Sequence, residues 1–342
     1  MLDTSKIRVG IIGFGYWGPN LARNVNLHPG AELVAVCDTD ADNRMRAAAK
    51  YPKARLVADS QAVLRADDID AVVIATPAGT HAFLAKAAFD AGKHVLITKP
   101  VSTSAASARE LAELAESSGK VLLVDHTFLY TQAVTQLKQL LDGKKLGRAL
   151  YYDSMRTGLG IFKSDADVID DLAVHDIAIT DYLFDERPHI VSAISAASIP
   201  GHLPSLAYVN FHYCSGLHVH IAAHWLSPIK QRKVVIAGSQ QMVCWDDTQP
   251  EHALLAYESG VVASSGPVVA GRAPLDYRHG TPQPIALAKS EALAGEIDDF
   301  IDSIRHRRQP RSCGRAAVRV MQMAEAAGQS ARQGGTPINI TW

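Results

Sequence analysis

The chain has 342 residues, of which 47% are hydrophobic and 20% charged, and its formal net charge at pH 7 is -1. This length exceeds one typical domain and supplies enough apolar residues for two cores, so we expect two domains. The near balance of charge, without a basic run, excludes a protein built to bind nucleic acid or an anionic membrane surface.

The cysteines and the first residues bear on the cellular compartment. Cys37, Cys214, Cys244 and Cys313 are scattered without a C-x-x-C pair, which indicates neither a zinc site nor a disulfide framework. A strand pattern begins within a few residues of the start, without an apolar signal segment, and no stretch has the length of a membrane span. We expect a cytoplasmic protein with reduced thiols and no membrane partner.

A glycine-rich turn follows the first predicted strand, residues 7–12. Gly13, Gly15 and Gly18 form a G-x-G-x-x-G pattern, and residues 20–27 are predicted to form a helix. In this context the first glycine makes the turn, the second lets the backbone approach a pyrophosphate, and the third lets the helix pack on the strand. The helix N-terminus offers N–H groups and a partial positive charge to the phosphates.

The second predicted strand, residues 32–37, ends at Asp38, about twenty residues after the last glycine. This spacing is typical of the acid that binds a ribose diol. A carboxylate here accepts hydrogen bonds from a free 2′-hydroxyl and repels a 2′-phosphate, which favours NAD over NADP as the cofactor. Arg44 lies close enough in the sequence to keep NADP open.

Strands and helices alternate through the rest of the first domain. Strands are predicted over residues 71–75, 94–97 and 121–124, and helices over 82–91 and 104–118. The alternation predicts an α/β fold with a doubly wound parallel sheet. Binding sites in such sheets lie at the carboxyl ends of the strands, which is where the sequence places Gly13, Asp38, Thr76, Pro77 and Lys99. We assign residues 1–125 to an NAD-binding Rossmann domain.

The pattern changes near residue 148. Strand-like segments occupy residues 149–155, 190–195, 206–213, 217–223, 233–237 and 242–245, with one helix predicted over 170–184. They indicate an α+β domain with a large open, mostly antiparallel sheet. Apolar residues at helical spacing from Leu293 to Ile304 predict a further helix, and a last helix is predicted over 315–332, before Gly334 and Gly335. We assign residues 126–342 to substrate binding and oligomerisation, with C-terminal helices that pack back on the first domain.

Two further motifs are candidates for chemistry. Lys99 precedes Pro100, which holds the lysine backbone extended and admits a cis bond. Asp171 and His175 lie four residues apart on one face of a predicted helix. An imidazole beside a carboxylate suits proton transfer because its pKa lies near working pH, but such a pair is also a common contact on a helix surface.

These motifs together resemble the Gfo/Idh/MocA oxidoreductases, the glucose–fructose oxidoreductase and inositol dehydrogenase family. The likeness rests on Gly15-Tyr16-Trp17-Gly18-Pro19-Asn20, Ala75-Thr76-Pro77 with Thr80-His81, Lys99-Pro100 and Asp171-x-x-x-His175, and it continues through residues 296–330. One departure is Thr98, where the family usually has glutamate. The resemblance implies that a cofactor binds to Gly13, Gly15, Tyr16, Trp17, Gly18, Asp38, Thr76, Pro77, His81 and Lys99.

The resemblance also implies the roles of the catalytic residues. His175 would be the general base, Lys99 the cation that stabilises the developing alkoxide, and Asp171 a group that orients His175 or a sugar hydroxyl. No metal is needed for this chemistry. The family tendency implies a homodimer or homotetramer.

The segments His126-Thr127-Phe128-Leu129-Tyr130, Asp171-Leu172-Ala173-x-His175-Asp176 and Trp225-Leu226-Ser227-Pro228 most resemble family members that act on nucleotide-linked amino sugars. They imply NAD-dependent oxidation of the 3-hydroxyl of UDP-N-acetylglucosamine to the 3-keto sugar, for 2,3-diamino sugars of lipid A or another surface polysaccharide. The alternatives are a sugar-nucleotide ketoreductase, a dehydrogenase of a free sugar or polyol, and a non-enzymatic NAD-binding sensor.

Several polar residues keep two interpretations. His126 and Tyr130 follow the last Rossmann strand and face either the substrate side or the core. The candidates to hold a substrate diphosphate, or else to be solvated charges, are Arg156, Lys163, Arg232 and Arg272. His218, His220 and His224 share one face of a strand, which favours a subunit interface over a metal site.

Overall fold

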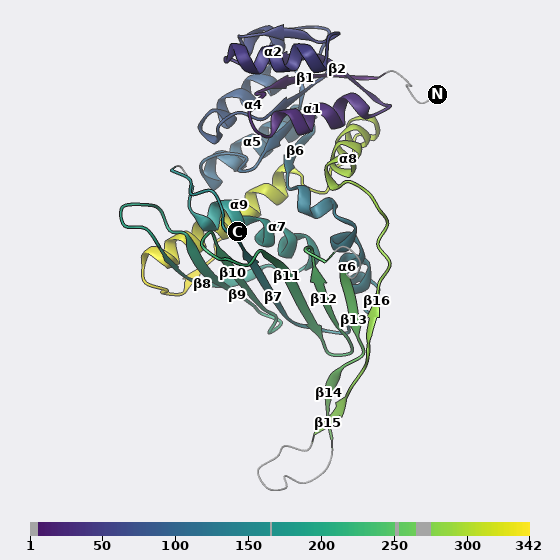
Figure 1. Ribbon diagram of the computed structural model, residues 1–342, viewed down its shortest axis with the longest axis vertical. Coiled ribbons are helices and arrows are strands. Elements are labelled where there is room, and N and C mark those ends of the chain that lie inside the picture. The colour runs from purple at the N-terminus through teal and green to yellow at the C-terminus, as the bar shows by residue number, and fades with distance from the viewer. Residues whose placement is uncertain (1–5, 165, 250–252, 265–274) are drawn as a thin grey trace. The chain divides into compact units, whose positions relative to one another are not determined.

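The computed structural model describes residues 6–164, 166–249, 253–264 and 275–342 (Figure 1). The chain divides into two compact units, and each unit is made of two chain segments. Unit 1 comprises Met1–Thr131 and Ser290–Met321, and unit 2 comprises Gln132–Lys289 and Gln322–Trp342. The first division therefore falls a few residues after the limit of 125 that the sequence predicted.

Unit 1 contains a six-stranded parallel sheet in the order β3-β2-β1-β4-β5-β6. The strands are β1 (Ile7–Ile12), β2 (Ala31–Cys37), β3 (Arg55–Val57), β4 (Ala71–Ile74), β5 (His94–Thr98) and β6 (Leu122–Asp125). β4 and β6 are buried throughout, because strands of a parallel sheet are covered by helices on both faces. The predicted doubly wound parallel sheet is confirmed.

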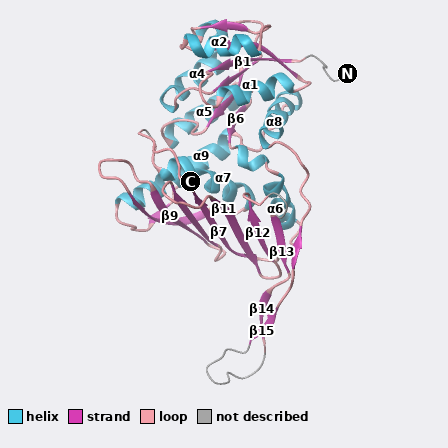
Figure 2. Cartoon of the chain, viewed as in Figure 1, coloured by secondary structure: helices cyan, strands magenta, loops and turns pink. Residues whose placement is uncertain are grey.

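Two hydrophobic clusters cover this sheet. One gathers side chains of α4 (His81–Asp90) and α5 (Ala105–Ser117), and the other gathers side chains of α1 (Gly18–Leu27) and α8 (Ala292–His306). Figure 2 shows α1 and α8 close together, with α4 and α5 beside the strands. The remaining short elements of unit 1 are α2 (Ala41–Lys50), α3 (Gln61–Leu64), η1 (Ala78–Thr80) and η2 (Thr127–Tyr130).

Unit 2 contains a nine-stranded sheet in the order β16-β13-β12-β11-β7-β10-β9-β8-β17. Its strands are β7 (Ala149–Thr157), β8 (Pro188–Ala196), β9 (Leu206–Tyr213), β10 (His218–His224), β11 (Gln231–Gly238), β12 (Met242–Asp246), β13 (Leu254–Tyr257), β16 (Pro282–Pro284) and β17 (Ile338–Asn339). Only the β7–β10 pair is parallel among the described pairs of this sheet. A hairpin of β14 (Gly260–Ala263) and β15 (Leu275–Arg278) forms a separate two-stranded sheet. The predicted mostly antiparallel sheet is confirmed.

Helices cover one face of the nine-stranded sheet. They are α6 (Gln132–Asp142), which the sequence did not predict, and α7 (Val174–Leu183), and both lie along that face in Figure 1. The opposite face carries exposed apolar side chains such as Tyr151, Met155 and Tyr208. The last helix, α9 (Gly314–Arg332), ends before Gly334 and Gly335, which both have positive φ angles. Within the described ranges no helix is both long and apolar enough to cross a membrane.

The helix predicted over residues 170–184 differs from the observed one at its start. Residues Ile169–Ala173 form a π-helical turn (η3), and the α-helix begins only at Val174. A π-turn bonds residues five apart, so it widens the helix. Asp171 lies in this π-turn and His175 in the first turn of α7, so the predicted pair stands where one kind of helix passes into the other.

Candidate active site

A cavity of about 600 Å³ lies at the carboxyl ends of β1, β2 and β4 in unit 1. Ligands of open parallel sheets bind at this edge, outside the carboxyl ends of the strands. Its lining includes five of the residues that the sequence assigned to the cofactor, namely Gly13, Gly15, Asp38, Thr76 and Pro77. The parallel topology explains why residues so far apart in the sequence meet here.

The three glycines of the turn have different reasons to be glycine. Gly13 has φ +100°, and a Cβ there would lie 2.5 Å from the Ala75 carbonyl oxygen. A Cβ on Gly18 would lie 2.2 Å from the Gly13 carbonyl oxygen. At Gly15, by contrast, a Cβ would meet no described atom within 4 Å. Gly13 and Gly18 are thus required by the fold, whereas the space over Gly15 is open to a ligand.

Asp38 is held rigidly at the edge of this cavity. One carboxylate oxygen accepts a hydrogen bond from the Phe14 N–H at 2.6 Å, and the other accepts one from the Asp40 N–H at 2.8 Å. Each oxygen keeps a lone pair for a further donor. Arg44 donates from its Nη1 to the carbonyl oxygens of Asp38 and Thr39, at 2.8 and 2.9 Å.

His81 joins two loops at this edge of the sheet. Its side chain is buried, and its ring nitrogens lie 2.7 Å from the carbonyl oxygens of Thr76 and Pro100. Burial lowers the pKa of this imidazole, and the two carbonyl contacts oppose the shift. The Lys99–Pro100 bond is cis. His81 therefore supports the loops after β4 and β5 from the interior.

Lys99 and His126 lie close together in unit 1. His126 is buried, and its Nδ1 has no hydrogen-bond partner among the described residues. Burial, with a smaller contribution from the Lys99 charge, lowers the pKa of His126 to about 4. A neutral imidazole thus stands beside the candidate catalytic lysine.

Tyr130 has the packing role that was one of its two interpretations. Its side chain is buried, and its hydroxyl donates to the Asp299 carboxylate at 2.9 Å and lies 3.0 Å from the Ser312 hydroxyl. The Arg311 guanidinium lies 5.0 Å from the ring centroid. We correct the assignment of Tyr130 to the substrate, because its polar group is already engaged inside unit 1.

The second pair of candidate catalytic residues belongs to unit 2. Asp171 accepts hydrogen bonds from Lys163 Nζ at 2.5 Å and from Trp225 Nε1 at 3.2 Å. His175 stands in the first turn of α7 and is half-buried. These contacts fix the Asp171 carboxylate at the π-turn, close in the sequence to the candidate base.

The assignment of Arg156 to the substrate also needs correction. Its side chain is 6% exposed, and its Nε donates to Asp176 at 2.7 Å. The same carboxylate accepts from the Tyr152 hydroxyl at 3.0 Å and from the Ser154 hydroxyl at 2.6 Å. A guanidinium that neutralises a fully buried aspartate is not available to a diphosphate.

The remaining candidates are the other basic residues suggested for a diphosphate and the histidines considered for a metal. Lys163 bonds to Asp171, Arg232 lies 3.2 Å from Asp247, and Arg272 lies outside the described residues. On the sheet, His220 lies 2.9 Å from the Asn210 side chain, and the His212 and His218 rings are 4.6 Å apart. No group of three or more potential ligands among the described residues has the arrangement of a metal site.

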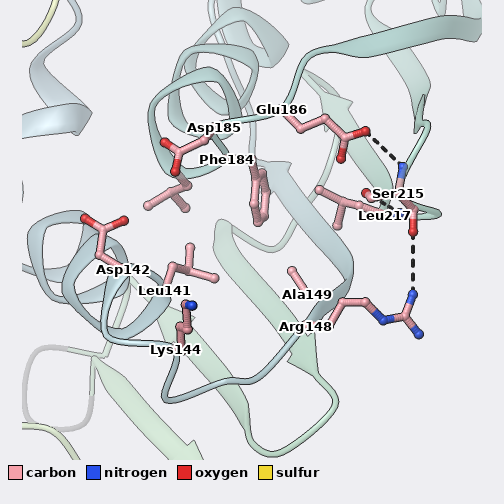
Figure 3. Close-up of a pocket in the computed structure, with 11 residues that line it drawn as sticks. Leu141, Asp142, Lys144, Arg148, Ala149, Phe184, Asp185, Glu186, Ser215 and Leu217 are labelled. Atoms are coloured by element: carbon pink, nitrogen blue, oxygen red, sulfur yellow. Dashed lines mark hydrogen bonds between the residues drawn. The ribbon is translucent and has the colours of Figure 1, made fainter.

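Unit 2 has a second cavity, of about 340 Å³, between α6, the end of α7 and the start of β7 (Figure 3). Exposed charged side chains line it, and in Figure 3 the Ser215 N–H donates to Glu186 while Arg148 reaches the Ser215 carbonyl oxygen. None of the predicted site residues lines this cavity, so we do not assign it to the reaction.

Two buried acids of unit 1, Asp125 and Glu296, were not among the predicted site residues. Asp125 is the last residue of β6 and accepts a hydrogen bond from Trp17 Nε1 at 2.5 Å. Glu296 lies in α8 with no exposed surface. A signal for Glu296 exists in the sequence, since it falls within the apolar stripe formed by Leu293, Ile297 and Phe300.

Two protein-family models match this chain, one N-terminal and one C-terminal. The family model described as "Oxidoreductase family, NAD-binding Rossmann fold" matches residues 7–126. The model described as "Oxidoreductase family, C-terminal alpha/beta domain" matches residues 163–340. Both belong to the family named Gfo/Idh/MocA, and together they span both units.

Individual relatives are more distant. The chain is 38% identical over 152 residues to the uncharacterized oxidoreductase YdgJ of Escherichia coli, which covers 44% of this chain and 43% of that protein. It is 33% identical over 227 residues to inositol 2-dehydrogenase of Rhodococcus erythropolis, which covers 64% of this chain and 65% of that one. The chain therefore matches less than two thirds of the length of these relatives.

A solved structure matches over more of the chain. UDP-N-acetylglucosamine 3-dehydrogenase of Acidithiobacillus ferrooxidans superimposes with a TM-score of 0.80 at 27% identity, over 95% of this chain and 97% of that one. The sequence of that enzyme is 28% identical over 327 residues, which covers 93% of this chain and 95% of that protein. Fold and domain order are thus shared across almost the full length.

Proposed function

The chain belongs to the Gfo/Idh/MocA oxidoreductase family, and from this premise we propose that it is an NAD-dependent dehydrogenase that oxidises a ring hydroxyl of a sugar or polyol. The observation that carries the proposal is the cavity at the glycine turn, in which Gly15 is open and Asp38 is fixed. The relatives named inositol 2-dehydrogenase and UDP-N-acetylglucosamine 3-dehydrogenase support the substrate class.

The residues of unit 1 fit a dinucleotide. The open space over Gly15 would admit a pyrophosphate, and the first turn of α1, all of it described, contains no acidic side chain that would repel it. The Asp38 carboxylate would accept the hydroxyls of a ribose. When bound, NAD supplies the carbon that accepts a hydride from the substrate.

We propose NAD rather than NADP. A 2′-phosphate would meet the negative charge of Asp38. Arg44, the residue that kept NADP open, directs its Nη1 to two backbone carbonyl oxygens. Asp38→Ser should lower the preference for NAD over NADP by at least about tenfold, because one charge–charge contact is removed. Unchanged Kd values for both cofactors would refute the role of Asp38.

The side chains that would act on the substrate are Lys99, His175 and Asp171. Lys99 is proposed to hydrogen-bond the hydroxyl that is oxidised and to stabilise its developing negative charge. His175 is proposed to accept the hydroxyl proton, and Asp171, held by Lys163 and Trp225, to keep that imidazole or a substrate hydroxyl in place. Tyr16, Trp17, His81 and His126 stay predicted members of the site.

Replacing the lysine tests this assignment. Lys99→Ala should lose about a thousandfold in turnover, as when a group that stabilises the oxyanion is removed. The Kd for NAD should stay within about threefold of the wild-type value. Lys86→Ala is the matched control, because that lysine is exposed in unit 1 and pairs with Asp90. Turnover of Lys99→Ala at the level of the control would overturn the proposed role.

For the substrate, the first compound to test is UDP-N-acetylglucosamine, with oxidation at its 3-hydroxyl. The relative of that name supports this choice because it matches over 93% of this chain. Formation of a 3-keto sugar nucleotide would serve the synthesis of 2,3-diamino sugars. The test is the rise of the NADH absorbance band with the UDP sugar, with free N-acetylglucosamine and myo-inositol run in parallel.

A free sugar or polyol is the second candidate, and one observation favours it. Of the four cations suggested for a diphosphate, the three that the structure describes each face a carboxylate in unit 2: Arg156 faces Asp176, Lys163 faces Asp171 and Arg232 faces Asp247. A rise of NADH with myo-inositol but not with the UDP sugar would support this candidate. Consumption of NADH with a keto sugar nucleotide alone would indicate the ketoreductase.

We also propose that the protein forms a homodimer or homotetramer through the uncovered face of the nine-stranded sheet. Tyr151, Met155 and Tyr208 are 40%, 42% and 40% exposed there, and apolar side chains that gather on one exposed face are typical of an interface. Met155→Glu should shift the molecular mass in light scattering toward the monomer. A mass unchanged by Met155→Glu and Tyr208→Glu together would contradict this interface.

A further inference from the structure

Unit 1 buries two carboxyl groups side by side at the end of β6. Asp125 is 5% exposed and Glu296, from α8, is 0% exposed. Buried acids are costly when charged and not paired with a cation. Their surroundings therefore decide which of the two carries the charge.

Asp125 is surrounded by donors. Its Oδ2 accepts from Trp17 Nε1 at 2.5 Å, and its Oδ1 accepts from the Thr127 hydroxyl at 2.5 Å and from the Thr127 N–H at 3.2 Å. Both oxygens of this carboxyl thus act as acceptors. A hydrogen bond between Asp125 and a neighbouring carboxyl group therefore needs the proton on that neighbour.

Glu296 has the opposite surroundings. Its two carboxyl oxygens are buried without a hydrogen bond of standard geometry among the described residues. Besides burial, the groups that act on it most strongly are the Asp125 carboxyl, the Thr127 side chain and the backbone of His126. Burial and, next, the Asp125 carboxylate raise the pKa of Glu296 well above its usual range. A neutral Glu296 is a hydrogen-bond donor toward its neighbour.

We propose that Asp125 and Glu296 form a carboxyl pair that holds one proton, and that this pair positions Trp17 and with it the glycine-rich turn for cofactor binding. Glu296 donates to Asp125, and Asp125 receives the Trp17 indole. The inference rests on the proposed function, since it concerns the same cofactor site. Asp125 and Glu296 are positioning residues, which act on the cofactor through Trp17.

The hydrogen bond between Trp17 and Asp125 joins the end of the glycine-rich turn to the end of β6. Trp17 is the residue just before α1, so its indole fixes the end of the turn that starts at Gly13. Asp125 pairs in sheet register with Thr98, the residue before Lys99. The pair therefore sets the glycine turn relative to the strand ends that carry Lys99 and His126.

The test uses variants that separate charge, donor and shape. Glu296→Gln keeps the size and a donor without any charge, so NAD binding by calorimetry should stay within about threefold of wild type. Glu296→Leu removes the donor and Asp125→Asn removes the charge that Trp17 binds, and each should raise the Kd for NAD about tenfold. The matched control is Glu116→Gln, whose carboxylate pairs with Arg315 at the surface of the same unit.

A second measurement reports the pair without cofactor or turnover. The Nε1–H resonance of Trp17, assigned by its loss in Trp17→Phe, should be kept in Glu296→Gln and should move upfield in Asp125→Asn, since a neutral acceptor makes a weaker bond. If Glu296→Leu does not fold, this resonance and the Kd for NAD in Glu296→Gln and Asp125→Asn still test the proposal.

Two outcomes overturn the proposal. If Glu296→Gln weakens NAD binding as much as Glu296→Leu, a charged Glu296 is required and the pair does not hold a proton. If the variants lower the melting temperature but leave the Kd and the Trp17 resonance unchanged, the acids have a purely structural role. Failure of the proposed function looks different, because wild-type protein would then bind NAD and turn over no sugar or polyol.

Discussion

The two units bury a carboxyl group in opposite ways. In unit 2, Asp176 is fully buried and is met by Arg156, Tyr152 and Ser154, which supply a cation and two hydroxyl donors. In unit 1, Glu296 is just as buried, and the charged group that acts on it most strongly is the Asp125 carboxylate. The first solution keeps a charge and neutralises it, whereas the second removes the charge by protonation.

Asp176 and Glu296 should therefore respond differently to substitution and to pH. An ion pair fails when one partner is removed, because the other charge is left in the interior. A protonated acid tolerates a neutral substitute of the same shape and depends on pH instead. Substitutions and pH titrations therefore distinguish the two kinds of burial.

The largest effect is expected when the ion pair is broken. Arg156→Met leaves the Asp176 charge buried without its cation and should lower the free energy of unfolding by about 3–5 kcal/mol, measured in urea. Arg232→Met is the matched control: Arg232 lies opposite Arg156 in the sheet register, and its pair with Asp247 is 38% and 29% exposed. The control should lose less than about 1 kcal/mol. Equal losses in the two variants would remove the distinction.

The next effect concerns His126, which unit 1 buries without charge. Its pKa is lowered to about 4 from 6.5 in the folded state, so the unfolded chain binds a proton first as the pH falls. The stability that depends on a neutral His126 is complete above pH 6.5 and is lost as the pH falls toward 4. Between pH 6.5 and pH 5, wild type should lose about 2 kcal/mol more than His126→Gln. Parallel acid titrations of the two proteins would contradict a buried neutral histidine.

Glu296 should show the opposite pH dependence. Its folded pKa is raised above the usual 4.5, so the contribution of this group to stability is complete below that pH and declines as the pH rises. Glu296→Gln cannot ionise, so its stability relative to wild type should increase by about 1 kcal/mol between pH 5.5 and 6.5. Melting temperatures across this range measure the difference. A difference that is constant with pH would mean that Glu296 is not protonated in the folded protein.

The smallest effect is expected for the exposed pairs. Glu116 and Arg315 bond at the surface of unit 1, and such pairs contribute little because water screens them. Glu116→Gln should leave the midpoint of unfolding in urea unchanged within experimental error at an ionic strength of about 0.15 M. A clear loss of stability would show that surface and buried carboxylates of this unit behave alike.

The sequence predicted most of the fold because most elements have a local signal. β1 and β9 were predicted with the bounds that the structure has, since apolar runs and alternation define them. α2 was missed because it is polar on nearly every side and buries only Ala47. α6 was missed although Val134 and Leu137 are buried at helical spacing, a signal that is present in the sequence.

The candidate site was predictable only where topology brings strand ends together. Gly13, Asp38 and Thr76 follow β1, β2 and β4, which are neighbours in the parallel sheet, so their approach to one cavity follows from the fold class. The fate of Arg156 was not predictable, because Asp176 lies on another element and the contact is tertiary. Whether Glu296 in an apolar stripe meets a cation or an acid is likewise decided by residues far away in the sequence.

The core of unit 1 is completed by a helix that is synthesised late. Leu293, Ile297, Phe300 and Ile301 of α8 belong to the same hydrophobic cluster as Phe14 and Leu21 near the start of the chain. While the ribosome is still adding the segment between residues 131 and 290, the growing chain therefore holds a Rossmann sheet with one face covered by α1 but not yet by α8. Nascent chains in this state are expected to need chaperone protection until α8 emerges and brings Glu296 to Asp125.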